Sequence, residues 1–233
     1  SLTMLATWTA GYYGIKIYLD NAEQKHKAAE ALHLAKESQL KMLRYQLNPH
    51  FMFNSINAIC TLILKQHNAN AVTMLEKLCD FLRYSLYTDP LEKITVQEEI
   101  TLLQTYIDIE QCRFQSELNV QISADKGCNS ALMPSLLLQP LVENAVKYAV
   151  APTRKPVTIT IAAGVEDGRL AIAVTDDGPG GRQGFASGFG IGLANVRDRL
   201  EARYGAEASL TAGPAGARGW HAVIRLPLER HDG

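Results

Sequence analysis

The hydrophobic and polar positions of the first half of the chain recur at helical spacing. Residues 21–47 are rich in Ala, Glu, Lys, Gln and Leu and contain neither Gly nor Pro, which predicts one long helix. Because Pro49 lacks an amide proton, the helix should kink beside it and then continue through residues 51–65. A polar break precedes a second amphipathic helix over residues 72–86, so the two helices predict an antiparallel hairpin.

The pattern changes near residue 117. Before it, Thr95 and Glu98 form a T-x-x-E capping box that should open a third helix reaching about Phe114. Beyond it, alternating apolar positions predict strands, and apolar positions at helical spacing predict helices. The expected strands cover residues 120–122, 157–161, 170–174, 208–212 and 220–227, and the expected helices cover residues 134–149 and 193–204. The C-terminal half is therefore expected to be an α+β domain of about a hundred residues.

The first 19 residues differ from everything that follows. They are apolar and aromatic with a single charge at Lys16, and the composition turns polar at residue 20. A membrane-spanning helix needs about 20 apolar residues, and this stretch falls slightly short. It carries Trp8 and three tyrosines of the kind enriched at a bilayer interface. We expect the inner end of a spanning segment, and the alternative is a short helix packed on the domain or on a partner chain.

Composition narrows the function classes. The 233 residues include 23 Lys and Arg against 24 Asp and Glu, for a net charge of −1. Without a global basic field, nucleic-acid binding is not expected. The four cysteines are widely spaced and contain no C-x-x-C pair, which argues against a disulfide scaffold and favours reduced thiols in a cytosol.

Three polar motifs in the C-terminal half indicate nucleotide chemistry. Asn144 and Lys147 share a helix face; an amide oxygen suits Mg²⁺ and an ammonium suits phosphates, although a solvated polar stripe has the same pattern. Residues 176–180 place an acid and two glycines at a strand end, so that Asp176 can accept a hydrogen bond from an exocyclic amine such as that of adenine. Residues 188–193 are glycine-rich and lead into a helix, which favours an anion site. Alone, each motif also suits an ordinary turn or loop.

Taken in order, the three motifs resemble a known set of boxes. N-A-x-K-Y at 144–148, D-x-G-x-G at 176–180 and G-x-G-I-G-L at 188–193 are similar to those of the ATP-binding fold shared by gyrase, Hsp90, MutL and histidine kinases. The resemblance covers about the last hundred residues. It implies a two-layer α/β sandwich that binds ATP together with Mg²⁺.

The resemblance also implies roles by position. Asn144 would be the Mg²⁺ ligand, with Lys147 and Tyr148 near the phosphates. Asp176 would contact the adenine amine. The remaining positions, which would form the lid and the phosphate cradle, are Gly178, Gly180, Gly188, Gly190, Gly192 and Leu193.

Residues 46–57 resemble the phospho-acceptor box of LytS-type sensor histidine kinases. In that box the His after Pro takes the γ-phosphoryl group of ATP, which implies that His50 is the acceptor. Neutral imidazole is a capable nucleophile near pH 7. In the commoner histidine kinases an acid follows the His, but Phe51 stands there in this chain, so the proton acceptor is unassigned. Asn54 lies one turn further on the same face and could orient the ring or a hydrolytic water.

Four further residues bear on the chemistry. Glu143 adjoins Asn144 and is a candidate catalytic residue, although a helix neighbour points about 100° away. In gyrase-type relatives a water-activating Glu lies one turn before the Asn, and here Pro140 stands at that place, which argues against an ATP hydrolase. Arg197 and Arg199 could contact either phosphates or only the domain surface.

Together these resemblances predict a homodimeric sensor histidine kinase of the inner membrane, with this portion on the cytoplasmic side. ATP would phosphorylate His50, and the group would pass to an Asp in the receiver domain of a response regulator. The alternatives are a nucleotide-binding scaffold without kinase activity and a gyrase- or Hsp90-like ATPase. The expected organisation is the end of a transmembrane or juxtamembrane segment at 1–19, a signalling helix or coiled coil at 20–38, dimerisation and histidine phosphotransfer helices at 39–116, and a catalytic ATP-binding domain at 117–233.

Overall fold

The computed structural model describes residues 49–87, 92–179, 191–216 and 218–230. Several expected features therefore lie outside the described residues: the apolar first segment, the helix over 21–47 with its kink before Pro49, and the three glycines at 180, 188 and 190. Within the described ranges, no helix combines the length and the apolar character needed to cross a membrane.

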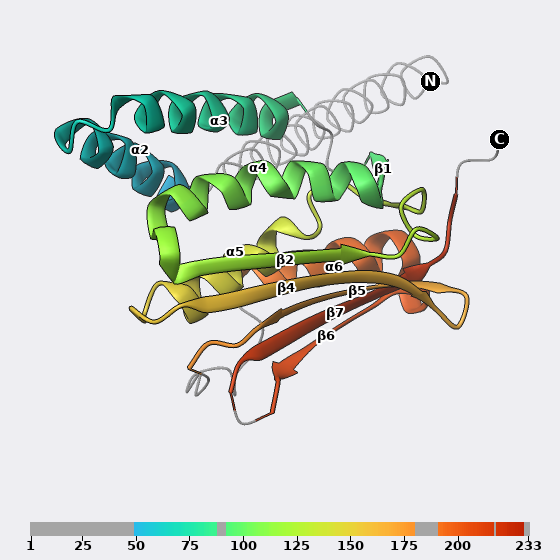
Figure 1. Ribbon diagram of the computed structural model, residues 1–233. Helices are drawn as coiled ribbons and strands as arrows, with labels where there is room; N and C mark the ends of the chain where they lie inside the picture. The colour runs from blue at the N-terminus through green and yellow to red at the C-terminus, as the bar shows by residue number, and fades with distance from the viewer. Residues whose placement is uncertain (1–48, 88–91, 180–190, 217, 231–233) are drawn as a thin grey trace, which may run out of the picture. The chain divides into compact units, whose positions relative to one another are not determined.

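Two successive helices open the described part of the chain, as predicted. Helix α2 (Pro49–Leu64) and helix α3 (Asn68–Tyr87) are joined by a tight turn that reverses the chain (Figure 1). The turn is closed by the His67 amide, which donates to the Leu62 carbonyl at 2.9 Å. One side of α2 is buried, and its buried residues are Phe51, Ser55, Ile59 and Leu62.

Helix α4 (Val96–Phe114) begins at the predicted capping box and ends in the short 3-10 helix η1 (Gln115–Glu117). The Thr95 hydroxyl accepts from the Glu98 amide at 3.2 Å, and the Glu98 carboxylate accepts from the Thr95 amide at 2.8 Å. Helix α3 contacts α4 through an ion pair between Lys77 and Asp108. The hairpin and α4 are therefore joined by polar as well as apolar contacts.

A five-stranded sheet follows in the order β2-β4-β5-β7-β6. Strand β2 pairs with β4 in parallel, and the other neighbours are antiparallel. Buried and half-buried positions alternate along most of β4, so one sheet face is covered more fully than the other. The strands are β2 (Leu118–Ala124), β4 (Val157–Glu166), β5 (Arg169–Asp176), β6 (Ser209–Pro214) and β7 (Trp220–Pro227).

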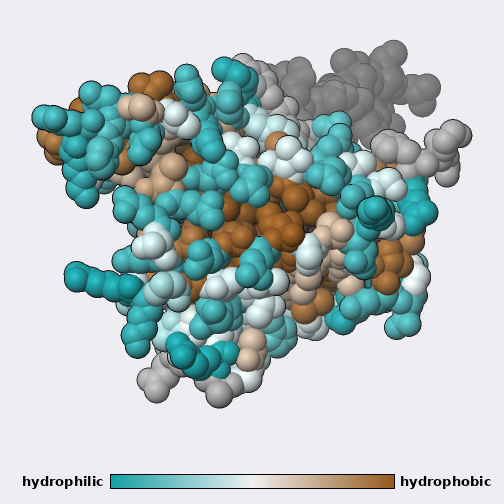
Figure 2. All heavy atoms as spheres, in the orientation of Figure 1, coloured by the Kyte–Doolittle hydropathy of each residue, from teal (hydrophilic) through white to brown (hydrophobic). Residues whose placement is uncertain are grey.

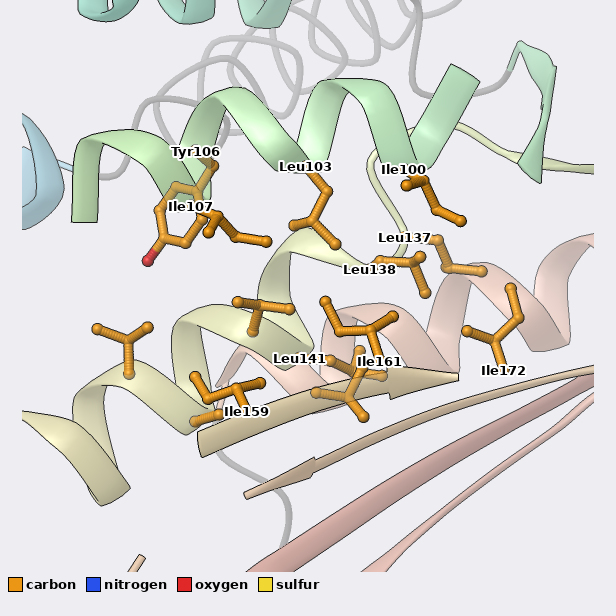
Figure 3. Close-up of a cluster of buried hydrophobic side chains, with 14 of the residues drawn as sticks. Ile100, Leu103, Tyr106, Ile107, Leu137, Leu138, Leu141, Ile159, Ile161 and Ile172 are labelled. Atoms are coloured by element: carbon orange, nitrogen blue, oxygen red, sulfur yellow. The ribbon is translucent and has the colours of Figure 1, made fainter. Parts of the chain in front are cut away.

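The covered face carries helix α5 (Gln139–Ala145), its π-helical continuation η2 (Val146–Val150) and helix α6 (Ile191–Tyr204), which ends in the 3-10 turn η4 (Gly205–Glu207). Figure 3 shows α4 directing apolar side chains toward α5 and the sheet. Figure 2 shows apolar residues gathered between α4 and β2 on the viewed face. The arrangement confirms the expected α+β fold with a helical layer on one sheet. The shared core includes Ile100, Leu103, Ile107, Leu137, Leu138, Leu141, Ile159 and Ile161.

The structure corrects one predicted helix and adds two short strands. The helix expected over 134–149 is wrong at its start, because β3 (Leu132–Pro134) pairs there with β1 (Lys93–Thr95) and α5 begins only at Gln139. Between them Leu136 has a φ of 54°, which no helix tolerates. The apolar residues of this loop are buried, so in sequence they are indistinguishable from a helix face. All five expected strands are present: β7 has its predicted bounds, and the other four are longer than predicted.

Candidate functional site

Asp176 is the last residue of β5 and is almost completely buried, with 4% of its surface exposed. It is centrally placed, since it pairs with Ile159 of β4 on one side and with Trp220 of β7 on the other. Its Oδ1 accepts a hydrogen bond from the Gly178 amide at 3.2 Å. The carboxylate is therefore fixed at the end of the sheet by the turn that follows it.

Two glycines make this turn possible. A Cβ on Gly178 would lie 2.5 Å from the Cβ of Ala149 in η2. A Cβ on Gly219 would lie 2.0 Å from the Asp176 carbonyl oxygen, and Gly219 has a φ of 79°. The Gly219 amide donates to the Gly178 carbonyl at 3.1 Å, so the two glycines bind each other across the turn. Gly219 was not singled out in the sequence, because it belongs to none of the three motifs.

Asp177 ties the same turn to the start of β4. Its Oδ1 accepts from the Thr158 amide at 2.7 Å, and its own amide donates to the Thr158 carbonyl at 3.2 Å. Unlike its neighbour Asp176, it is exposed. The two adjacent acids therefore differ in function: Asp177 closes the turn, whereas Asp176 lies buried at its base.

Asn144 is half-buried on α5, and its Nδ2 has no hydrogen-bond partner among the described residues, although that atom is buried. A Cβ on Gly192, in the first turn of α6, would lie 3.6 Å from this Nδ2 and 3.7 Å from the Cβ of Pro140. A buried donor without a partner costs free energy. A bound ligand that offers an acceptor would remove this cost.

The structure thus brings parts of all three motifs together. Gly192 of the third motif lies against Asn144 of the first, and Gly178 of the second lies against Ala149, which follows the first motif in η2. These segments are far apart in sequence, and only the packing of α5 on α6 and on β5 makes them neighbours.

Lys147 and Tyr148 both lie in η2. Lys147 is exposed, and its Nζ lies 4.9 Å from the centroid of the Tyr148 ring. Because the π-helix has more residues per turn than an α-helix, the shared face expected for Asn144 and Lys147 does not follow from α-helical spacing. Leu193 is 2% exposed and belongs to the apolar core.

Glu143 faces α4. Its Oε1 accepts from Gln139 Nε2 at 2.8 Å, within α5. Its negative charge contributes to the raised pKa values of Tyr106 and Glu110, although burial is the largest cause for both groups. Asn144, the next residue, lies instead beside Gly192 of α6.

The sequence left open whether Arg199 contacts phosphates or only the protein, and the structure shows its protein contacts. Its guanidinium donates to the carbonyls of Ser135 at 2.7 Å and Leu136 at 3.2 Å, and burial lowers its pKa. Arg199 therefore holds the backbone of the loop before α5. Arg197, two residues earlier, is exposed.

His50 is exposed at the start of α2, and the structure pairs it with Asn54. The Asn54 Nδ2 lies 3.1 Å from His50 Nδ1 and 3.2 Å from Nε2, so the Asn54 amide contacts both ring nitrogens. Phe51 is buried, with its ring centroid 5.0 Å from those of Phe81 and Tyr106. Phe51 therefore anchors the helix while His50 remains accessible.

The sequence motifs do not single out two buried acids on α4. Glu99 accepts from the amides of Leu136 at 2.8 Å and Leu138 at 2.9 Å; burial raises its pKa, and these hydrogen bonds oppose the rise. Burial raises the pKa of Glu110 to about 7, against the opposing effects of Arg113 and the Tyr106 hydroxyl. Their positions in the sequence indicate burial, because Glu99 and Glu110 lie on the same face of α4 as the buried Leu103 and Tyr106.

The described residues include no group of three or more His, Cys, Asp or Glu side chains that could hold a metal ion. Mg²⁺ commonly keeps few protein ligands and takes the rest from substrate phosphates and water. A single amide such as Asn144 therefore fits a metal that arrives with a nucleotide.

Comparison with known proteins gives two family matches. A model described as "Histidine kinase" matches residues 38–118, and one described as "Histidine kinase-, DNA gyrase B-, and HSP90-like ATPase" matches residues 130–230. Together they cover both the hairpin with α4 and most of the sheet domain.

The chain is similar to sensor histidine kinase YesM of Bacillus subtilis, with 35% identity over 83% of this chain and 34% of that protein. It is 33% identical to sensor protein LytS of Staphylococcus haemolyticus, over 90% of this chain and 37% of that protein. The chain thus spans about a third of the length of these curated relatives. A histidine kinase domain from Erythrobacter litoralis EL346 aligns with a TM-score of 0.46 at 19% identity, over 82% of this chain and 93% of that one.

Proposed function

The chain belongs to the histidine kinase family, and from this premise we propose that it uses ATP to phosphorylate His50 and then passes the phosphoryl group to an Asp of a response regulator. The observation that carries the proposal is the meeting of three segments: the buried Asp176 at a sheet end, the Asn144 amide, whose Nδ2 has no hydrogen-bond partner among the described residues, and Gly192 at the start of α6.

In this proposal the nucleotide binds between the end of β5 and the start of α6. Asp176 accepts a hydrogen bond from the adenine amine, and the glycines beside it let the base approach the backbone. Asn144 would hold Mg²⁺, which would neutralise charge on the phosphates. The start of α6 offers backbone amides to the same phosphates, with Lys147 and Tyr148 nearby in η2.

His50 supplies the nucleophile. The unprotonated ring nitrogen attacks the γ-phosphorus, so that the N–P bond forms while the P–O bond to ADP breaks. Asn54 is a positioning residue, because its amide contacts the ring nitrogens and can fix the orientation of the imidazole. Its distance to both nitrogens supports a role in presenting the ring.

We further propose that the hairpin forms a homodimer. Large apolar side chains are exposed along α2 and α3, and on soluble proteins such patches mark interaction surfaces. A second hairpin would cover them in a four-helix bundle. The exposed residues are Phe53, Ile56, Ile63, Leu64, Val72 and Leu75.

The apolar residues 1–19 support attachment to the inner membrane, with the histidine and the nucleotide site on the cytoplasmic side, where ATP is available. A receiver domain of a response regulator would then reach the exposed His50.

The decisive experiment incubates the protein with γ-labelled ATP and Mg²⁺. We expect an acid-labile, base-stable label on the wild type and on His67→Gln, which changes an exposed histidine in the turn of the same hairpin. His50→Gln should remain unlabelled. Equal labelling of His50→Gln would refute the assignment.

Two other results would favour the rival functions. Nucleotide binding without any label on the wild type would indicate a scaffold. Release of free phosphate without a labelled protein would indicate an ATPase of the gyrase or Hsp90 kind.

A further inference from the structure

Helix α5 begins without a capping side chain of its own. Its N-cap residue is Leu138, which has no side-chain acceptor, and Pro140 stands in its first turn. The first amides of a helix need partners from elsewhere. Glu99 of α4 binds the segment just before the helix, since its two carboxylate oxygens accept from the amide of Leu136 at 2.8 Å and from that of the N-cap residue Leu138 at 2.9 Å.

The same loop is held from the opposite side by α6. Arg199 donates to the carbonyls of Ser135 and Leu136, and its charge attracts that of Glu99. Leu136 has a φ of 54°, a left-handed conformation that leucine rarely adopts. Such a conformation persists when its surroundings fix it, and here Glu99 and Arg199 fix it from two helices.

These contacts of Glu99 and Arg199 with the loop fix how α5 lies against α6. Gly192 and Arg199 are seven residues apart and share a face of α6. Gly192 lies against Asn144 of α5, and Arg199 binds the loop before α5. Helix α6 therefore contacts α5 and its preceding loop at two separate points. Glu99 ties the beginning of the same helix to α4.

We propose that Glu99 is a positioning residue of the nucleotide site: by holding the loop before α5 together with Arg199, it sets the place of Asn144 relative to Gly192. The inference rests on the proposed function, because it concerns the site in which Asn144 would hold Mg²⁺. A carboxyl buried among apolar side chains costs free energy unless it is fully hydrogen-bonded, and its two bonds at Leu136 and Leu138 meet that condition. Helix α4 thereby acts on the site without touching the ligand.

The test compares Glu99→Gln with Glu98→Gln. The first is isosteric but turns one acceptor into a donor that faces an amide. The second removes the same charge from the neighbouring residue, and glutamine can still form a capping box.

Dissociation constants are measured for MgATP and for adenosine, together with thermal unfolding. Glu99→Gln should bind MgATP roughly tenfold more weakly, the size typical of supporting groups around a metal ligand, while adenosine affinity changes less than about twofold. Glu98→Gln should match the wild type.

Equal losses for MgATP and adenosine, or no loss for either, would overturn the positioning role. If Glu99→Gln does not fold, Arg199→Lys provides the same test, because lysine keeps the charge but not the two-pronged hold on the loop. Failure of both variants to fold would assign the pair to stability alone and overturn the proposal. A wild type that binds no MgATP would instead refute the proposed function, which keeps the two failures distinct.

Discussion

Gly178 lies directly against Ala149: a Cβ atom on the glycine would stand 2.5 Å from the Cβ and 3.0 Å from the Cα of the alanine. The turn after β5 and the π-helix after Asn144 are therefore in contact, with space for a hydrogen atom and not for a methyl group. This contact links the turn that holds Asp176 to η2, which continues the helix α5 that carries Asn144.

Gly178→Ala should push η2 away from the turn. We expect a loss of about 1–3 kcal/mol in the free energy of unfolding, as for other overpacked sites, and weaker MgATP binding. Chemical denaturation and nucleotide titration measure the two effects. Gly127→Ala is the control, because a Cβ there meets nothing within 4 Å. Equal stability of both variants would contradict the contact.

Asp176→Asn should reduce the preference for ATP over GTP. In the proposed function the carboxylate accepts a hydrogen bond from the adenine amine, whereas guanine would present an oxygen at the same position. An amide can donate to that oxygen, so the ratio of the two dissociation constants should fall by about tenfold. Competition binding measures this ratio. Asp177→Asn should leave it unchanged, because the exposed Asp177 only closes the turn through Thr158.

Asn54→Ala should alter the rate at which His50 gains or loses its phosphoryl group. One hydrogen bond contributes about 1 kcal/mol, which corresponds to about fivefold in rate. Time courses of labelling with γ-labelled ATP, and of label loss after its removal, check the prediction. Asn57→Ala, an exposed position on the same helix, is the control. If both rates of Asn54→Ala equal those of the wild type, the contact has no role in positioning.

Glu110 should make stability depend on pH. Its pKa of about 7 exceeds the ordinary 4.5, mainly through burial, and Glu143 adds to the rise while Arg113 and Tyr106 oppose it. The folded state therefore holds this proton more tightly than the unfolded state. The resulting stabilisation is complete below pH 4.5 and is lost as the pH rises through 7.

Glu110→Gln should accordingly flatten this dependence and unfold at higher urea than the wild type at pH 8, by on the order of 1 kcal/mol. Urea unfolding at pH 5.5 and pH 8, chosen on either side of about 7, checks the effect. Glu201→Gln, an exposed position on α6, should keep the wild-type profile. A wild type whose stability rises between the two pH values would contradict the assignment.

Ile63→Lys should weaken the proposed dimer. The side chain is 53% exposed in the single chain, although it is large and apolar. Burying a charge at an interface should raise the dissociation constant by at least about tenfold, or 1.4 kcal/mol. Sedimentation equilibrium measures this change. Thr61→Lys places the same charge on another face of α2, and its dissociation constant should stay near that of the wild type.

The local features of this protein were readable in its sequence. Residues a few positions apart settle helical periodicity, so α2, α3, α4 and α6 were predicted, and the reciprocal bonds of Thr95 and Glu98 followed from their spacing of three. The residue types and order of the three motifs likewise indicated the family. These features depend on neighbours along the chain, and a single sequence contains that information.

The tertiary structure decided which distant groups meet. The apolar residues 134–138 read as a helix, yet β3 pairs with β1 and the amides of the loop go to Glu99, some forty positions earlier. Nothing in the sequence of α4 specifies that partner, because a buried acid is stabilised only by groups that the fold delivers to it. The contact of Gly192 with Asn144 has the same origin. The sequence by itself thus determined the elements and the chemistry available, and the packing of α4, α5 and α6 on the sheet determined the site.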